Sequence, residues 1–441
     1  MTTELNPLAL DRAVRDTARR WRHWRRSLRR GTALDTDPFV FDRQVTGRTL
    51  FRQVSELPEA HPLRQPLRRW IYRFAEQRIN RPCLTAYAFE RRLRRHGVER
   101  PETLQLSLAA MIHRALGSRA QRGAWLDAAV ECSARAVQHA TLLWERRKEI
   151  AVQMGLEGPD PIELPCSEVA AIADEWLQLG DDLLETSGTQ SAAEWIDAAL
   201  GEDASAGWPS RLDPPSMRDL LSEGGLLDGL ELDAGPLPHV YAASSFLRGL
   251  ARVGAAWADA AAAKNQPFVV AHDPHGSSRR SHGALFALLP LNPSFARRRL
   301  RLSERDWAKH RRTLARVVLL ESRAAALRVV LRTSALAGAT AWRDAFPLAV
   351  ERALGIGLRH ARPSVFWQLH VDDGQRFAGL LLAPLRAQQL TESHDQDWFR
   401  NPRAVDQLRS EAALPPECEI PADRLRDGAV ALRRALVDAL S

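Results

Sequence analysis

The sequence predicts an all-α protein, built as a large multi-helix bundle or a helical bowl. Segments with apolar residues three and four positions apart recur along all 441 residues. Only Phe268-Val-Val-Ala271 has the composition of a strand, so at most a short β element is expected near 267–272. With 45% hydrophobic residues, a chain of this length can bury one large core or two or three adjoining ones.

The first helix is expected to begin at Asn6-Pro7, an N-cap followed by proline in the first turn, and to end near Gly31. Its apolar stripe has alternating spacings of four and three and consists of Leu10, Val14, Thr17, Trp21, Trp24 and Leu28. Arginines occupy the other faces. We interpret this segment as an amphipathic helix whose tryptophans face the core. The alternative is an arginine and tryptophan element that binds phosphates or stacked bases.

A polar, turn-rich stretch follows from 32 to about 57. Helical periodicity then predicts four more helices before the first clear break at 155–161, at 61–80, 86–96, 102–116 and 119–154. Two further helices are expected at 167–185 and 191–200, with Ser167 and Ser191 as their N-caps.

The stretch 201–215 is rich in Gly, Ser, Asp and Pro, which indicates a boundary. It would separate an N-terminal helical region, 1–200, from a C-terminal one, 216–441. Ser303-Glu-Arg-Asp306 resembles a capping box that opens a long helix. The helices expected beyond the boundary are 214–223, 244–263, 303–336, 341–354, 363–390, 397–412 and 422–440.

The net charge of +8 and the pI of about 10.0 allow nucleic-acid or other polyanion binding through an arginine-rich surface. This alternative is not favoured, because 54 acidic residues are mixed among the basic ones. The four widely spaced cysteines suit reduced thiols in the cytoplasm. We expect no membrane span and no secretory signal, because no run approaches 18 apolar residues and the N-terminus has no basic segment followed by an apolar one.

Standard catalytic motifs are missing from the sequence. None of the 13 histidines precedes a glutamate, so HExxH is absent, and neither GxSxG nor a phosphate-binding loop occurs. His272, His275 and His282 form a cluster that could hold zinc or iron, although a solvated turn is the simpler interpretation. Asp372-Asp373 could likewise be an acid/base pair but is more typical of a turn. We therefore expect no cofactor, with zinc only in the histidine-cluster alternative.

Four stretches carry a family resemblance, and they span about residues 240–412: Ser245-Phe-Leu-Arg-Gly-Leu-Ala-Arg-Val-Gly254, 310–328, 376–389 and 397–408. They resemble the helical zinc peptidases of the oligoendopeptidase F/thimet oligopeptidase type. Arg248, Gly249 and Arg252 fall where that family has His, Glu and His. The resemblance implies an enclosing helical bowl with a central groove, and the loss of zinc binding and of peptide hydrolysis.

Arg248 and Arg252 would lie one turn apart on one helix face. Guanidinium groups stay protonated, so they cannot ligate a metal ion but can bind a carboxylate or phosphate with two hydrogen bonds. Alternatively, they form salt bridges with Glu321 or Asp259. The sequence thus predicts a non-catalytic helical binding or scaffold protein, a peptidase-like pseudoenzyme whose groove binds a peptide or an anionic ligand through Arg248, Arg252 and Glu321. A polyanion-binding protein and a metal-dependent hydrolase are the alternatives.

Overall fold

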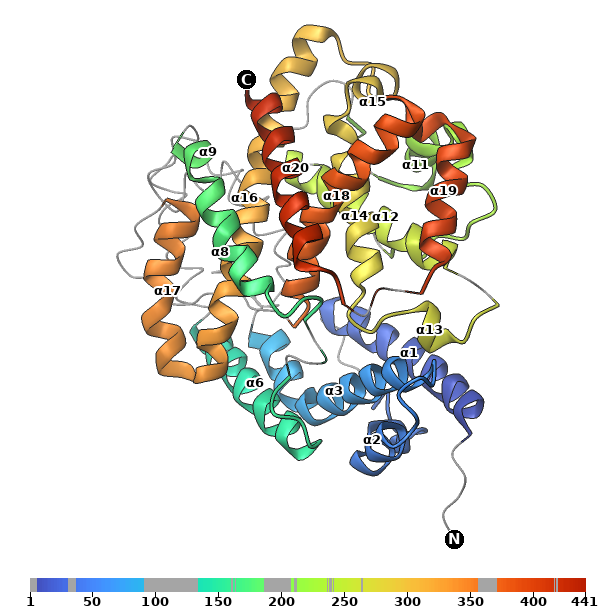
Figure 1. Cartoon of the computed structure of the whole chain (residues 1–441), viewed down its shortest axis with the longest axis vertical. Coiled ribbons are helices and arrows are strands. Elements are labelled where there is room, and N and C mark those ends of the chain that lie inside the picture. The colour runs from blue at the N-terminus through green and yellow to red at the C-terminus, as the bar shows by residue number, and fades with distance from the viewer. Residues whose placement is uncertain are drawn as a thin grey trace, which may run out of the picture.

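The structure is a computed structural model, and Figure 1 shows a molecule built from helices. It describes residues 6–30, 37–90, 134–159, 162, 164–185, 208–209, 212–235, 237, 240, 242–262, 265–355, 371–415, 417 and 419–441. Within these ranges every regular element is an α-helix or a short 3-10 helix, which confirms the predicted fold class. No helix in these ranges is both long enough and apolar enough to cross a bilayer.

One group of helices lies at the lower end of Figure 1 and surrounds the smaller of two hydrophobic clusters. It contains α1 (Pro7–Arg30), η1 (Arg43–Thr46), α2 (Arg48–Ser55), α3 (Arg64–Glu90), the end of α6 (Ala134–Gln153) and α13 (Phe268–Ala271). Trp21 and Trp24 of α1 are buried here, and Trp21 meets the ring of Trp70 edge to face at 6.5 Å. The core-facing interpretation of the first helix is confirmed.

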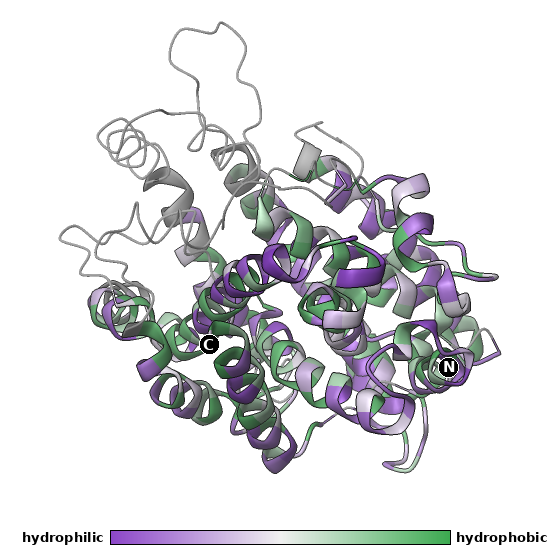
Figure 2. Cartoon of the chain, turned by 90° about the horizontal axis from the view of Figure 1, so that it is seen from above, coloured by the Kyte–Doolittle hydropathy of each residue, from purple (hydrophilic) through white to green (hydrophobic). Residues whose placement is uncertain are grey.

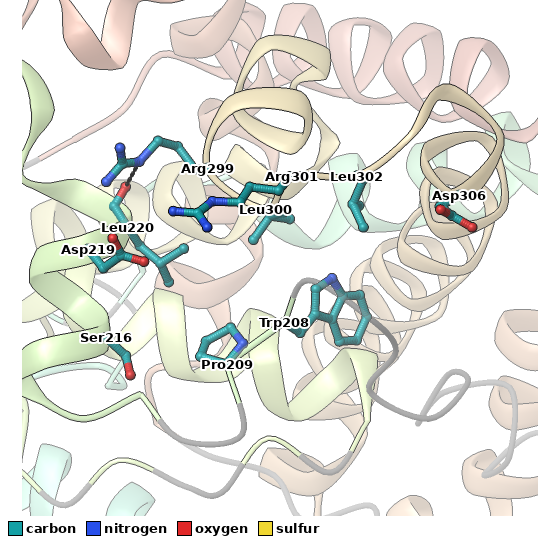
Figure 3. A pocket seen from close by; sticks show the side chains of 10 residues that line it. All are labelled: Trp208, Pro209, Ser216, Asp219, Leu220, Arg299, Leu300, Arg301, Leu302 and Asp306. Carbon is teal, nitrogen blue, oxygen red and sulfur yellow. Dashed lines mark hydrogen bonds between the residues drawn. The ribbon is translucent and has the colours of Figure 1, made fainter.

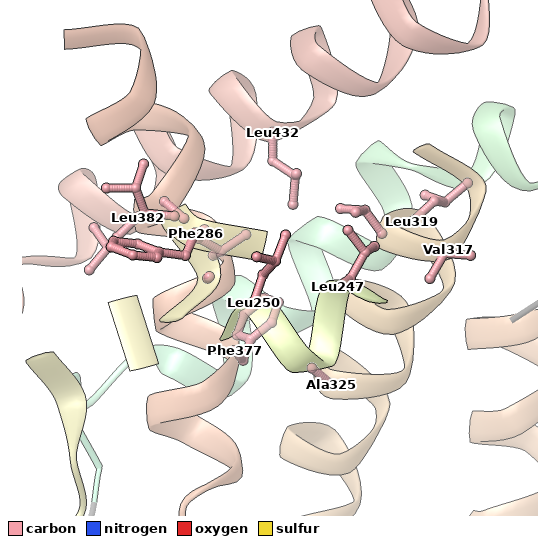
Figure 4. Close-up of a cluster of buried hydrophobic side chains, with 14 of the residues drawn as sticks. Leu247, Leu250, Phe286, Val317, Leu319, Ala325, Phe377, Leu382 and Leu432 are labelled. Carbon is pink, nitrogen blue, oxygen red and sulfur yellow. The ribbon is translucent and has the colours of Figure 1, made fainter. Parts of the chain in front are cut away.

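The remaining helices enclose the larger cluster, part of which Figure 4 shows. They are α8 (Val169–Leu179), α9 (Asp181–Glu185), α11 (Pro214–Leu221), α12 (Ala243–Ala261), α14 (Ser277–Leu288), α15 (Pro293–Arg298), α16 (Glu304–Ala337), α17 (Ala339–Leu354), α18 (Asp373–His394), α19 (Pro402–Ala413) and α20 (Ala422–Leu440), with 3-10 turns η2 (Glu223–Gly225), η3 (Leu289–Leu291) and η5 (Trp398–Arg400). Figure 2 shows that most helices carry both hydrophilic and hydrophobic residues, as amphipathic helices around a core do.

The predicted boundary at 201–215 falls largely outside the described residues, so the division into two regions stays a prediction. The helix α8, which precedes that boundary, contributes Ile172 and Trp176 to the larger cluster.

Helices α12 and α14 approach each other so closely that only glycine fits at two crossing points. A Cβ atom on Gly254 would lie 2.6 Å from the carbonyl oxygen of His282, and one on Gly283 would lie 2.7 Å from the carbonyl oxygen of Ala251. Real Cβ atoms do not approach backbone oxygen this closely. The two backbones are therefore in direct contact along this pair.

Close backbone contacts at glycine also join α18 and α20 to this pair. A Cβ atom on Gly379 of α18 would lie 2.8 Å from the carbonyl carbon of Arg280 in α14, and one on Gly428 of α20 would lie 2.5 Å from the carbonyl oxygen of Leu381 in α18. Helices α12, α14, α18 and α20 thus form a row in which each is held against the next by a close approach at glycine.

A fully buried guanidinium fixes the position of α8 and α17 against α16. Arg323 donates to the carbonyl oxygens of Ala353 at 2.6 Å, Leu177 at 2.8 Å and Arg352 at 3.0 Å, and to the carboxylate of Asp181 at 2.6 Å. The three carbonyl groups lie in the last turns of α8 and α17, where helices leave acceptors unpaired and where a cation is favoured.

The strand predicted near 267–272 is wrong, because Phe268–Ala271 forms the single helical turn α13. A strand needs a neighbouring strand to accept its hydrogen bonds, and here the backbone N–H of Val269 donates instead to the carboxylate of Asp11 in α1, at 2.8 Å. The turn lies against α1 and α3, and Val269 is buried in the smaller cluster.

Other helix boundaries also differ from the prediction. The turn-rich stretch 32–57 contains α2. The segments 61–80 and 86–96 join in α3, which the structure describes to Glu90. The residues from 277 to 298, for which no helix was predicted, form α14 and α15. Predicted helices at 102–116 and 191–200, with parts of those at 86–96, 119–154 and 363–390, lie outside the described residues. Helix α14 was missed because its polar, glycine-containing sequence has a weak periodicity and its conformation depends on packing against α12 and α18.

We expect Gly254→Ala to lower the free energy of unfolding by about 2 kcal/mol or more, because the new methyl group would meet the backbone of α14. Gly158→Ala, after α6, is the control, because its Cβ atom would meet nothing within 4 Å and its φ is not positive. Urea denaturation of both variants should place the control within about 1 kcal/mol of wild type. Equal losses would contradict the close approach of α12 and α14.

Candidate functional site

Helix α12 carries the three positions at which the family resemblance expects zinc ligands and a catalytic glutamate. Phe246, Leu250 and Trp257 on its apolar face are fully buried. Arg248 and Arg252 lie one turn apart and are both exposed. The exposure of Arg248 leaves its guanidinium group accessible to an anion in solvent.

Gly249 lies between these arginines and is covered by the side chain of Leu212, which precedes α11. The space beside α12 that a longer side chain at this position would need is thus filled by an apolar residue. Trp208 covers the helix one turn earlier, with its ring stacked on Phe246 at 5.1 Å. Trp208 and Leu212 therefore both lie against α12.

Glu321 of α16, the third predicted ligand-binding residue, belongs to a different group of charges. Its carboxylate favours the protonated forms of Arg328 and Arg376. Asp373, at the start of α18, interacts with both of these arginines, and Asp372 interacts with Arg376. Burial lowers the pKa of Arg376, but these three carboxylates together hold it above its usual value.

Two direct ion pairs complete this group of charges. Arg328 donates from Nε to Oδ1 of Asp373 at 3.0 Å, and Arg280 of α14 pairs with Asp372. The arginines and acids thereby connect α14, α16 and α18. Asp372 and Asp373 lie at the start of α18, and each forms an ion pair with an arginine of another helix. This arrangement favours a structural role for the two aspartates over a role as a catalytic acid and base.

The three histidines of the predicted metal cluster face three different environments. His272 lies 3.8 Å from Asp259 and against the ring of Phe268, and burial lowers its pKa. His282 lies inside α14, with Nδ1 2.9 Å from the carbonyl oxygen of Ser278 and its ring against Trp257. Among the described residues, no three His, Cys, Asp or Glu side chains are close enough together to hold a metal ion.

His275 lies at a buried polar cluster that the sequence did not predict. Glu76 of α3 accepts from Arg73 at 2.7 Å and pairs with Arg147 of α6 at 2.9 Å, and all three are almost completely buried. Burial lowers the pKa of His275 to about 4, so the ring is neutral at pH 7, and its charge interactions include those with Glu76 and Asp273. The only sequence signal for this cluster was the Arg73/Glu76 spacing of three on a helix.

A cavity of about 470 Å³ lies between α11 and the connection from α15 to α16, as Figure 3 shows. Its apolar wall is formed by Trp208, Pro209, Leu220, Leu300 and Leu302. The polar groups that line it are those of Ser216, Asp219, Arg299, Arg301 and Asp306. Its lining is thus divided evenly between apolar and polar residues, and a cavity of this volume can hold a small molecule or the end of a peptide.

The two arginines of the cavity differ in their contacts. Arg299 donates from Nε to the carbonyl oxygen of Leu220 at 3.1 Å and pairs with Glu223 at 2.6 Å. Arg301 is exposed, and its backbone has a φ of 54°, in the left-handed region that non-glycine residues rarely adopt. The sequence analysis did not single out either residue, because neither belongs to a recognisable motif.

A prediction follows from His282, whose burial, together with the charge of Arg386, lowers its pKa from the usual 6.5 to about 3. Between about pH 3 and pH 6.5, the imidazole of His282 therefore binds a proton in the unfolded chain but not in the folded chain. Stability is thus fully present above about pH 6.5 and is lost as the pH falls toward 3. Between pH 6.5 and 4.5 this residue should account for a loss of about 2 kcal/mol.

Urea denaturation at several pH values would measure this dependence. We expect His282→Phe to have a shallower loss of stability below pH 6.5 than wild type, whereas His23→Phe, at an exposed position of α1, should keep the wild-type slope. Parallel curves for wild type and His282→Phe would contradict a neutral buried imidazole at this position.

Comparison with known proteins supports only a relationship of fold. No family model matches the sequence, and no curated protein matches it. Among solved structures, the chain is similar to PZ peptidase A solved with an inhibitor, with a TM-score of 0.59 and 9% sequence identity over 89% of this chain and 83% of that one. The similarity in fold thus extends beyond the residues 240–412 that carry the sequence resemblance.

Proposed function

We propose that this chain is a non-catalytic helical binding protein, a peptidase-like pseudoenzyme that binds a peptide or another anionic ligand. The observation that carries the proposal is the cavity of about 470 Å³ beside α12, which combines apolar walls with two arginines. Such a site can bury an apolar group and orient a negative charge without any catalytic residue.

The chemistry of α12 supports binding over catalysis. If the family resemblance is applied position by position, Arg248 and Arg252 replace two zinc ligands, and a guanidinium cannot ligate a cation. Gly249 replaces the glutamate that would activate water, and it has no side chain that could act as a base. Leu212 covers the space in which such a side chain would lie.

The location of the cavity supports the proposal as well. Trp208 forms part of its wall and stacks on Phe246 of α12, so the cavity adjoins the helix that carries Arg248 and Arg252. These exposed arginines remain our candidates for additional contacts with acidic groups of a longer ligand. Glu321 would act indirectly, through the charges of Arg328 and Arg376.

A cavity-filling variant tests the proposal. We expect Ser216→Trp, which places an indole in the cavity, to weaken binding of a fluorescent-peptide mixture by at least about tenfold, measured by polarisation. Ser222→Trp adds the same side chain at an exposed position just after α11, outside the cavity, and should bind like wild type. Equal binding by both variants would exclude the cavity, and the double Arg248→Ala, Arg252→Ala variant would then show whether those arginines bind the peptides.

Metal analysis of untagged protein separates this proposal from the metal-dependent hydrolase. We expect less than about a tenth of an equivalent of zinc, iron or manganese, because arginine and glycine replace the ligand set on α12. Close to one equivalent of metal, lost in His272→Ala or His275→Ala, would instead make the histidine cluster an active site and overturn the non-catalytic proposal.

A further inference from the structure

We propose that the cavity between α11 and the α15–α16 connection recognises a free carboxylate that has an apolar group beside it. This inference rests on the proposed binding function and names the class of ligand. It follows from one buried donor, one available cation and the balance of charge around the cavity.

The donor is the indole N–H of Trp208. The ring is nine-tenths buried, between Phe246 at 5.1 Å and His310 at 5.2 Å, yet its Nε1 atom has no hydrogen-bond partner. An indole N–H can only donate, and a buried donor without an acceptor is unfavourable. The ring of Trp208 lines the cavity while Nε1 itself is covered, so a small shift of the ring would let a ligand oxygen supply the acceptor that the protein does not.

The cation is Arg301. Among the contacts of the described residues it has neither an ion pair nor a hydrogen bond from its guanidinium, whereas Arg299 beside it is held by Glu223 and Leu220. In Figure 3 its side chain extends from the α15–α16 connection toward α11. The guanidinium is thus available to a ligand.

The backbone of Arg301 is held in its unusual conformation by its neighbours. The N–H of Leu300 donates to the carbonyl oxygen of Phe295 at 3.3 Å, and that of Leu302 donates to the carbonyl oxygen of Ala296 at 3.2 Å. A left-handed conformation costs a non-glycine residue free energy, and residues in such conformations concentrate at ligand-binding sites. Here the turn places a guanidinium at the cavity, which a glycine would not provide.

The charges around the cavity favour a ligand with a single negative charge. Asp219 and Asp306 line it together with Arg299 and Arg301, so the formal charges of the lining cancel. The carboxylates of Asp219 and Asp306 would repel a phosphate or a polyanion more strongly than they would repel a ligand with a single carboxylate group. The guanidinium of Arg301 can bind the two oxygens of that group with two N–H donors, while Leu220, Leu300 and Leu302 supply apolar walls for a neighbouring side chain.

Titration calorimetry with three probes tests the inference: the peptide Ala-Ala-Ala-Leu with a free C-terminus, the same peptide as its C-terminal amide, and hexanoate. We expect the free acid to bind about tenfold to a hundredfold more tightly than the amide. Binding of hexanoate as tight as that of the peptide acid would identify the source as a small apolar acid. Weaker binding of hexanoate would identify it as a peptide C-terminus.

Variants of Arg301 separate charge from structure. Arg301→Gln should lower the affinity for the peptide acid about tenfold or more and leave that for the amide unchanged. Arg301→Gly accepts the positive φ and should show the same loss of affinity with a stability at least equal to wild type. Arg305→Gln, an exposed arginine of α16 outside the cavity, should bind like wild type.

The outcomes distinguish this inference from the proposed function. Equal binding of acid and amide, both weakened by Ser216→Trp, would overturn carboxylate recognition and leave peptide binding in the cavity standing. Wild-type affinity of Arg301→Gln for the acid would also overturn the inference. No binding of any probe, together with no binding of the peptide mixture, would overturn both.

Discussion

The architecture depends on the direct backbone contact between α12 and α14 at Gly254 and Gly283. Interhelical distance is set by the side chains at the contact, so glycine at the crossing points brings two helices as close as their backbones allow. Further glycine contacts bring α18 and then α20 into the same row. Once this row is fixed, α16 packs against it through Leu319 and Ala325, in the core that Figure 4 shows. Arg323 then holds α8 and α17 against α16.

The candidate cavity lies beside this rigid row, and its walls come from shorter segments. Trp208 and Leu212 contact α12, whereas Arg299 and Arg301 belong to the region between α15 and α16. Sites supported by a rigid scaffold commonly take their recognition groups from such connecting segments. The core of the fold and the specificity of the cavity therefore depend on different residues, which is why we expect substitution of Arg301 to change binding without harming the fold.

The similarity to PZ peptidase A concerns architecture, and chemistry has to be argued from the residues of this chain. Arginine and glycine on α12 cannot perform the roles that histidine and glutamate have in the family that the sequence resembles. In the part of the chain that the structure describes, the buried charges that we can trace hold helices together: Glu76 with Arg73 and Arg147, and Asp373 with Arg328. These buried charges therefore stabilise the packing of α3 against α6 and of α16 against α18.

The sequence by itself determined the helical class, because apolar periodicity in long helices such as α1 and α16 depends only on residues near one another in the chain. It also determined that HExxH is missing. Only the tertiary structure decided that 268–271 is a helical turn and that Glu321 lies with Arg328 and Arg376. It alone placed Trp208 and Arg301 in the lining of one cavity. These features depend on contacts between segments distant in sequence, which local periodicity does not encode.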